Sequence, residues 1–94
     1  MGVSYRGKEM NKEEQDKIDG VIAKAWADAD FKRRLVADAT TVLKAAGVPP
    51  PQGYEFTTMI VSGVNDREIA IQIAMHPVNK PYYYGEVIHT ASKP

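Results

Sequence analysis

The sequence of 94 residues contains no cysteine. Disulfide bonds, thiolate nucleophiles and cysteine-based metal sites are therefore excluded. The chain also has no excess of charge, since 12 Lys and Arg balance 12 Asp and Glu. No apolar run approaches the roughly 18 residues of a membrane-spanning helix, and the N-terminus has no secretory pattern. These absences predict a cytoplasmic chain without a membrane or nucleic-acid partner.

The composition predicts one small folded domain. The sequence is 44% hydrophobic and 26% charged, which is too apolar for wholesale disorder but supports only a thin core. Residues 1–10 contain two glycines and show no hydrophobic periodicity, so we expect a flexible arm there. A folded domain over residues 11–77 and a tail over residues 78–94 follow. Stability is expected to be modest or shared with a partner, so self-association remains open.

Three helices are predicted before residue 50, at about residues 12–27, 29–37 and 39–46. Asn11 followed by Glu14 is a capping-box start for the first helix. Asp28 and Asp38 are N-caps for the next two, because their carboxylates accept hydrogen bonds from free backbone N–H groups. Gly47 then ends the third helix as a glycine beyond the C-cap.

The apolar stripes of these helices predict the core and leave one question open. Trp26 lies on the stripe of the first helix, and Phe31 and Leu35 face inward from the second. For Trp26 both core packing and a role as an interface hot spot are considered, with core packing favoured. Gly20, inside the first helix, costs about 1 kcal/mol relative to alanine. It indicates either close packing or a weakly stable helix.

Two strands are predicted after a proline-rich connector, giving an α+β fold with helices packed on an antiparallel hairpin. The strands cover about residues 54–62 and 67–75, joined by turn residues 63–66. The second strand alternates strictly, so one face should meet the helices. That face consists of Ile69, Ile71, Ile73 and Met75. Residues 78–94 are an extended tail, whose YYYGEVIHT segment could add a third strand or stay mobile.

A search for chemistry finds no catalytic constellation. His76 and His89 are separated by a proline-containing loop, which is not a metal-ligand spacing. The serines and threonines carry no nucleophile-elbow pattern, and no glycine-rich phosphate loop is present. The sequence predicts no catalytic residue, no metal site and no cofactor, and therefore a protein that is not an enzyme.

A set of spaced residues nevertheless resembles a known family. The chain is similar to the N-terminal half of nitrile hydratase alpha subunits and to the nitrile-hydratase-like leader peptides of proteusin precursors, over about residues 13–77. The residues that carry the resemblance are Trp26, Asp28, Phe31, Leu35, Asp38, Leu43 and Gly47. The hydratases have a cysteine-rich metal-binding loop near the position of Ala74 to Pro77, where this sequence has no thiol. The resemblance therefore implies the leader role rather than hydratase activity.

In such precursors of ribosomally synthesised and modified peptides, a folded leader is bound by a maturation enzyme that acts on the following residues. The resemblance implies that residues 78–94 are the core peptide. Tyr83, Tyr84 and Gly85 resemble the Xaa-Tyr-Gly motif of spliceotide precursors, in which a radical SAM enzyme excises part of a tyrosine. These three are the modification candidates. The alternative is a degenerate, non-catalytic accessory or assembly subunit of the hydratase type.

Candidate recognition residues follow from the expected contact surface, which is the hairpin edge or the face of the first helix. They are Trp26, Phe31, Leu35, Ile69, Ile71 and Ile73.

Overall fold

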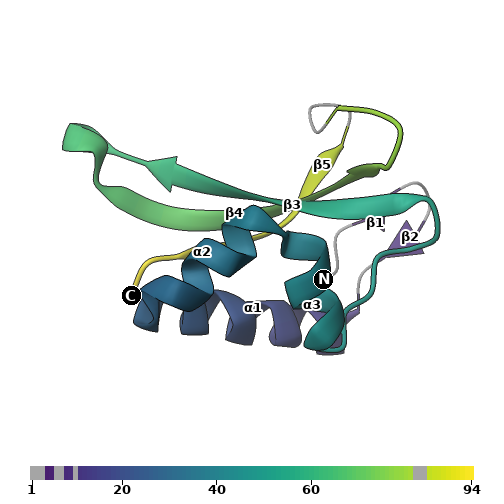
Figure 1. The fold of residues 1–94 in the computed structure, drawn as a ribbon, viewed down its shortest axis with the longest axis horizontal. Helices are drawn as coiled ribbons and strands as arrows, with labels where there is room; N and C mark the ends of the chain where they lie inside the picture. Colours follow the sequence, from purple (N-terminus) through teal and green to yellow (C-terminus); the bar gives the residue numbers. More distant parts are fainter. Residues whose placement is uncertain (1–3, 6–7, 10, 82–84) are drawn as a thin grey trace.

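Helices cover one face of an antiparallel sheet in the computed structural model, which describes residues 4–5, 8–9, 11–81 and 85–94 (Figure 1). Two short strands, β1 (Ser4–Tyr5) and β2 (Lys8–Glu9), pair with each other before the first helix. Three helices follow, and then a three-stranded sheet in the order β3-β4-β5. The predicted α+β class is confirmed.

The first helix, α1 (Lys12–Ala27), begins at the predicted capping box. The Asn11 side chain accepts a hydrogen bond from Glu14 N at 2.8 Å, and Asn11 N donates to Glu14 Oε1 at 3.3 Å. Together these two bonds satisfy two backbone donors that a helix start leaves free. The stripe that packs into the core consists of Ile18, Val21, Ile22 and Ala25.

The next two helices, α2 (Ala29–Ala37) and α3 (Ala39–Ala45), begin at the two predicted aspartates. Asp28 Oδ1 accepts from Phe31 N at 3.2 Å, and Asp38 Oδ1 accepts from Thr41 N at 3.2 Å. Helix α3 ends one residue before the predicted boundary. Gly47 adopts a φ of 94°, and Val48 N donates to Leu43 O at 2.8 Å. This is the Schellman geometry that a glycine beyond the C-cap allows.

The predicted hairpin is formed by β3 (Tyr54–Ser62) and β4 (Glu68–Pro77), which pair antiparallel. The second strand starts one residue later than predicted and runs two residues further. Asn65 and Asp66 in the turn both have a φ of 59°, a left-handed conformation that these two residue types tolerate better than most. The turn residues therefore suit the backbone that closes the hairpin.

The tail ends in a third strand, β5 (Glu86–Ser92), antiparallel to β4 on the side away from β3. Ile88 is 1% exposed and belongs to the core. Lys93 N donates to Ile69 O at 2.8 Å just beyond the strand. Of the two possibilities that the sequence left open for this segment, the added strand is the one observed.

The face of β4 that packs on the helices was predicted correctly for three residues and wrongly for one. Ile71 and Ile73 are 0% exposed and Met75 is 4% exposed, whereas Ile69 is 45% exposed. Ile69 lies beside Gly63 at the hairpin end, where the register shifts between Val61 and Ser62. The pairing joins Val61 to Ala70 and Ser62 to Glu68 and skips Ile69, and a bulge of this kind re-aims a side chain locally.

Candidate functional site

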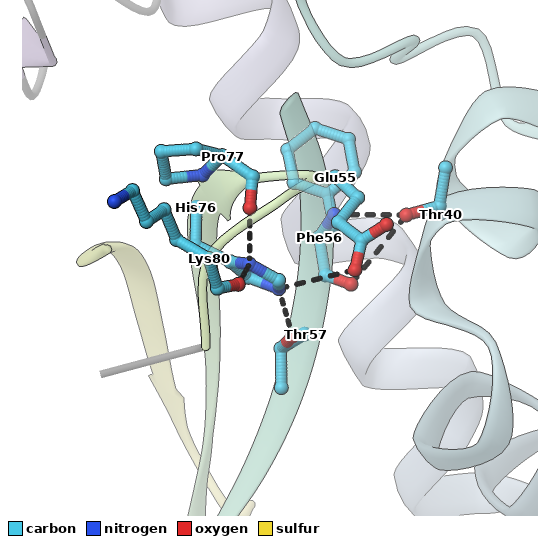
Figure 2. Close-up of polar contacts among 7 residues, drawn as sticks. All are labelled: Thr40, Glu55, Phe56, Thr57, His76, Pro77 and Lys80. Atoms are coloured by element: carbon cyan, nitrogen blue, oxygen red, sulfur yellow. Dashed lines mark hydrogen bonds and ion pairs between the residues drawn. The ribbon is translucent and has the colours of Figure 1, made fainter. Parts of the chain in front are cut away.

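A polar cluster centred on the buried His76 lies at the C-terminal end of β4 (Figure 2). The imidazole is 5% exposed. Its Nδ1 lies 3.1 Å from the carbonyl oxygen of Pro77 and 3.2 Å from that of Lys80. Carbonyl oxygens only accept hydrogen bonds, so Nδ1 carries the hydrogen. The ring thereby holds the start of the connection between β4 and β5.

The other ring nitrogen faces β3. His76 Nε2 lies 2.8 Å from Thr57 Oγ1 and 3.5 Å from Glu55 Oε1. In the neutral ring with hydrogen on Nδ1, Nε2 accepts from the Thr57 hydroxyl. Both ring nitrogens are thus engaged with the protein itself. His76 is 5% exposed, so its imidazole ties β4 to β3 and to the connection that follows β4, and a substrate has little access to it.

A second tie joins the outer edge of β3 to α3. Phe56 N donates to Thr40 Oγ1 at 2.8 Å, and the same hydroxyl donates to Phe56 O at 3.4 Å (Figure 2). One threonine therefore pairs both backbone groups that Phe56 presents away from β4. Thr58 Oγ1 donates to Leu35 O at 3.0 Å on the same edge. The outer edge of β3 is partly covered in this way.

Between these ties lies a polar hollow of about 460 Å³. Its lining residues come from the junction of α2 with α3 and from the start of β3: Val36, Ala37, Asp38, Ala39, Thr40, Thr41, Glu55, Phe56 and Thr57. The Thr41 hydroxyl donates to Asp38 Oδ2 at 2.7 Å, and this bond, with the Thr41 backbone N–H, holds the pKa of Asp38 below its usual value. The Asp38 carboxylate thus serves as a cap, and the hollow gains no reactive group from it.

The predicted recognition residues fall into two groups. Leu35, Ile71 and Ile73 are each 0% exposed, so in the folded chain they hold the core and do not reach a partner. Trp26 and Phe31 are partly buried and pack against that core. Together with Ile69, they are the members of the predicted set that keep accessible surface.

Two lysine side chains lie beside the ring of Trp26. The ammonium groups of Lys32 and Lys93 lie 5.3 Å and 5.5 Å from its ring, within the range of cation–π attraction. Its indole N–H is buried without a hydrogen-bond partner among the described residues. Core packing, the favoured interpretation of this tryptophan, agrees with its contacts.

Of the modification candidates, Tyr83 and Tyr84 lie outside the described residues, and Gly85 is placed. A Cβ at Gly85 would lie 2.7 Å from His76 Cβ and 2.8 Å from the carbonyl carbon of Met75, closer than real Cβ atoms approach. Glycine is therefore required here for β5 to enter the sheet beside β4. The Tyr-Gly sequence has a structural reason for its glycine, in addition to the functional one that the resemblance implies.

Sequence reasoning missed the residues that tie the elements together. The contact of Thr40 with β3 could not be predicted, because a threonine inside a helix gives no sequence signal for the strand that it will contact. His89 Nε2 lies 2.5 Å from Asp19 Oδ1, joining β5 to α1 across 70 positions. The sequence contains both residues but no pattern that pairs them.

These elements define a small α+β domain with a helix-covered sheet and, over the described residues, no group of three or more side chains able to hold a metal ion. The sequence profile of nitrile hydratase, alpha chain, matches residues 4–73. The match covers most of the chain, which belongs to the nitrile hydratase alpha-chain family.

Two curated relatives match more locally. The chain is 40% identical over 43 residues to the low-molecular weight cobalt-containing nitrile hydratase subunit alpha of Rhodococcus rhodochrous, covering 46% of this chain and 21% of that protein. It is 44% identical over 39 residues to a nitrile hydratase subunit alpha of Rhodococcus sp, covering 42% of this chain and 20% of that protein. The alignments thus span about a fifth of each relative. No solved structure matches the chain significantly.

No helix in the described ranges combines the length and apolar character needed to cross a membrane.

Proposed function

We propose that this chain is the precursor of a modified peptide, in which the helices and hairpin are a recognition domain for a maturation enzyme. The observation that carries the proposal is the extent of the family match, which covers residues 4–73 and leaves the segment from 78 onward outside it. The connection from β4 to β5 lies beyond the matched residues, and a recognised domain followed by a substrate segment is the arrangement that the leader resemblance implies. Binding the domain raises the effective concentration of the segment at the enzyme. We expect this chain and its maturation enzyme to meet in the cytoplasm.

Within the proposed core peptide, residues 78–94, we expect the enzyme to act on the connection between β4 and β5. It starts at Val78, which is 57% exposed and donates from its backbone N–H to Gly53 O at 2.9 Å. It finishes at Gly85, packed against β4. Tyr83 and Tyr84 belong to this connection by sequence. A substrate segment anchored at both ends needs little sequence specificity from the enzyme that modifies it, because its ends are already positioned.

The chain itself is proposed to be non-catalytic. One relative is named as cobalt-containing, but the donors available here do not fit a resident metal ion. The sequence has no cysteine, and the described residues hold no cluster of three or more His, Asp or Glu. His76 has both ring nitrogens bonded within the fold. No step of a reaction is therefore assigned to this chain.

A second candidate, a non-catalytic accessory or assembly subunit, is favoured by one observation. β5 pairs with β4 and places Ile88 in the core, so much of the tail is part of the domain. A subunit whose role is assembly has no need of a segment held out for modification. This candidate predicts a stable oligomer in size-exclusion chromatography with light scattering, whereas the precursor, purified without a denaturation step, is expected to be monomeric in the absence of its enzyme.

The test of the first proposal is co-expression with each tailoring enzyme encoded beside this chain, followed by mass spectrometry of proteolytic fragments. We expect a mass change confined to the fragment that contains residues 78–85. Tyr84→Phe should abolish the change if the tyrosine phenol is needed, whereas Tyr54→Phe, on β3, should leave it intact. An unchanged tail mass with every neighbouring enzyme would contradict the precursor role.

A further inference from the structure

An apolar groove of about 370 Å³ lies at the junction of α1, α2 and α3. Its walls combine the exposed side of α1 with one residue of α2 and the last turns of α3: Lys17, Gly20, Val21, Lys24, Phe31, Val42, Ala45 and Ala46. Phe31 and Val42 are only partly buried against the core, so they present apolar surface to the groove. A hollow of this size accommodates a few large side chains.

Gly20 keeps the groove open. A Cβ at this position would have nothing within 4 Å, so the glycine is not needed for packing within the chain. Glycine in a helix interior still costs about 1 kcal/mol relative to alanine. The open question left by the sequence, close packing or a weak helix, is thus answered against internal packing. The space above Gly20 is available to the backbone or side chain of another molecule.

The rim of the groove is positively charged. Lys17 and Lys24 line it, and no carboxylate lies within ion-pairing distance of either ammonium among the described residues. Lys24 Nζ lies 4.6 Å from the Phe31 ring centroid, and the Arg34 guanidinium lies 5.9 Å from it. Three nearby aspartates are committed elsewhere: Asp16 to Lys12, Asp30 to Arg33 and Asp19 to His89. The chain is neutral overall, so this positive surface is local.

We propose that the groove binds an amphipathic helix of a partner protein, with apolar side chains against Phe31 and Val42 and acidic side chains at the lysine rim. Lys17 and Lys24 are two helical turns apart, roughly 10 Å along α1. Acidic residues seven positions apart on a partner helix repeat at the same distance. Shape and charge together specify this occupant, since helix-in-groove recognition depends on an apolar stripe and its flanking charges.

This surface does not depend on the precursor role. A maturation enzyme or an assembly partner could each present such a helix, and the groove exists whether or not residues 78–85 are modified. The test therefore uses synthetic probes with the full chain.

The experiment titrates the isotope-labelled full chain with a helical peptide carrying leucines at i, i+4 and i+7 and glutamates on both flanks. A matched peptide has lysines in place of the glutamates. We expect saturable NMR shifts at Gly20, Val21, Phe31 and Val42 with the acidic peptide. The lysine peptide should bind on the order of tenfold more weakly, and salt should weaken the acidic complex.

Substitutions test separately how the shape of the groove and the charge of its lysines contribute to peptide binding. Gly20→Leu should fill the groove and abolish the shifts at Phe31 and Val42 while the chain stays folded, because nothing inside the chain occupies that space. Lys17→Glu combined with Lys24→Glu should reverse the preference between the two peptides. Lys12→Glu, at an exposed lysine paired with Asp16, should leave binding unchanged.

Several outcomes would overturn the proposal. Shifts that do not saturate, that map outside the groove, or that are equal for the two peptides would each do so. A parallel titration uses vesicles of phosphatidylserine and phosphatidylcholine. Shifts at the groove with the vesicles and none with the acidic peptide would assign the surface to a membrane and reject the helix. None of these outcomes bears on the mass change expected for the precursor.

Discussion

Asp19 and His89 lie 70 positions apart, and their side chains share a hydrogen bond of 2.5 Å between Asp19 Oδ1 and His89 Nε2. The bond fastens the last strand to the first helix. Together with the bond from Lys93 N to Ile69 O, it makes β5 an integral part of the domain.

The first prediction concerns this bond. Asp19→Asn removes the carboxylate that accepts from His89, so the backbone amides of β5 should exchange hydrogen faster. The cost should be modest, roughly 0.5 kcal/mol, because Asp19 is 56% exposed. Hydrogen exchange measured by NMR locates the effect. Asp16→Asn is the control, since it breaks an exposed pair with Lys12 away from β5. Faster exchange throughout the sheet would contradict a role specific to β5.

The second prediction is that Gly85→Ala destabilises the domain. The new methyl group would overlap the backbone of Met75, and β5 must move to relieve the overlap. Overpacking of this kind costs about 1–3 kcal/mol. Urea unfolding followed by circular dichroism measures the change. Unaltered stability would mean that the connection between β4 and β5 relaxes freely.

The third prediction is that Gly20→Ala has the opposite effect. The same methyl group here meets nothing within 4 Å and improves helix propensity, so the free energy of unfolding should rise by about 1 kcal/mol. The same urea unfolding experiment compares the two variants directly. A loss of stability would indicate that the glycine serves the fold in a way that its surroundings do not reveal.

The fourth prediction tests the tie between α3 and the edge of β3. Thr40→Val keeps the shape of the side chain but leaves the backbone N–H and C=O of Phe56 without the hydroxyl. We expect a loss of about 1–3 kcal/mol, the cost of unpaired polar groups in a partly buried site. Thr90→Val, at an exposed position on β5, is the matched control. Equal effects of the two variants in thermal unfolding would argue against the tie.

The fifth prediction concerns the stability of the domain at low pH. Hydrogen bonds from Thr41 lower the pKa of Asp38 in the folded chain below its unfolded value of about 3.8. The unfolded state therefore takes up a proton first as the pH falls, and the stabilisation from this carboxylate, present in full above the unfolded pKa, is lost between the two values. Asp38→Asn should reduce the dependence of stability on pH below about pH 4. The measurement is urea unfolding from pH 2 to 6; an identical acid slope for both proteins would refute this assignment.

Local signals in the sequence were sufficient for the helices and the hairpin. Asn11, Asp28 and Asp38 cap their own helices through contacts two or three residues away, and such contacts can be recognised without knowing the fold. The alternation of β4 likewise predicted the burial of Ile71 and Ile73. These features depend on neighbours in the chain.

Features that depend on distant residues were not predictable in the same way. Whether the tail forms a strand depends on the free edge of β4 and on Asp19, and neither is visible in the tail itself. The polar cluster of His76 depends on Thr57 across the hairpin. The exposure of Ile69 follows from a bulge that strict alternation gives no reason to expect.

The position of β5 at one edge of the sheet has a consequence for folding and assembly. The helices and the hairpin form through contacts between elements close in sequence, while docking of β5 against α1 closes a long loop and is expected to come late. Opening of β5 alone uncovers the edge of β4 and the core position of Ile88. The same strand from a second copy fits that edge equally well, so concentrated protein refolded from denaturant should yield strand-exchanged dimers that separate slowly on dilution.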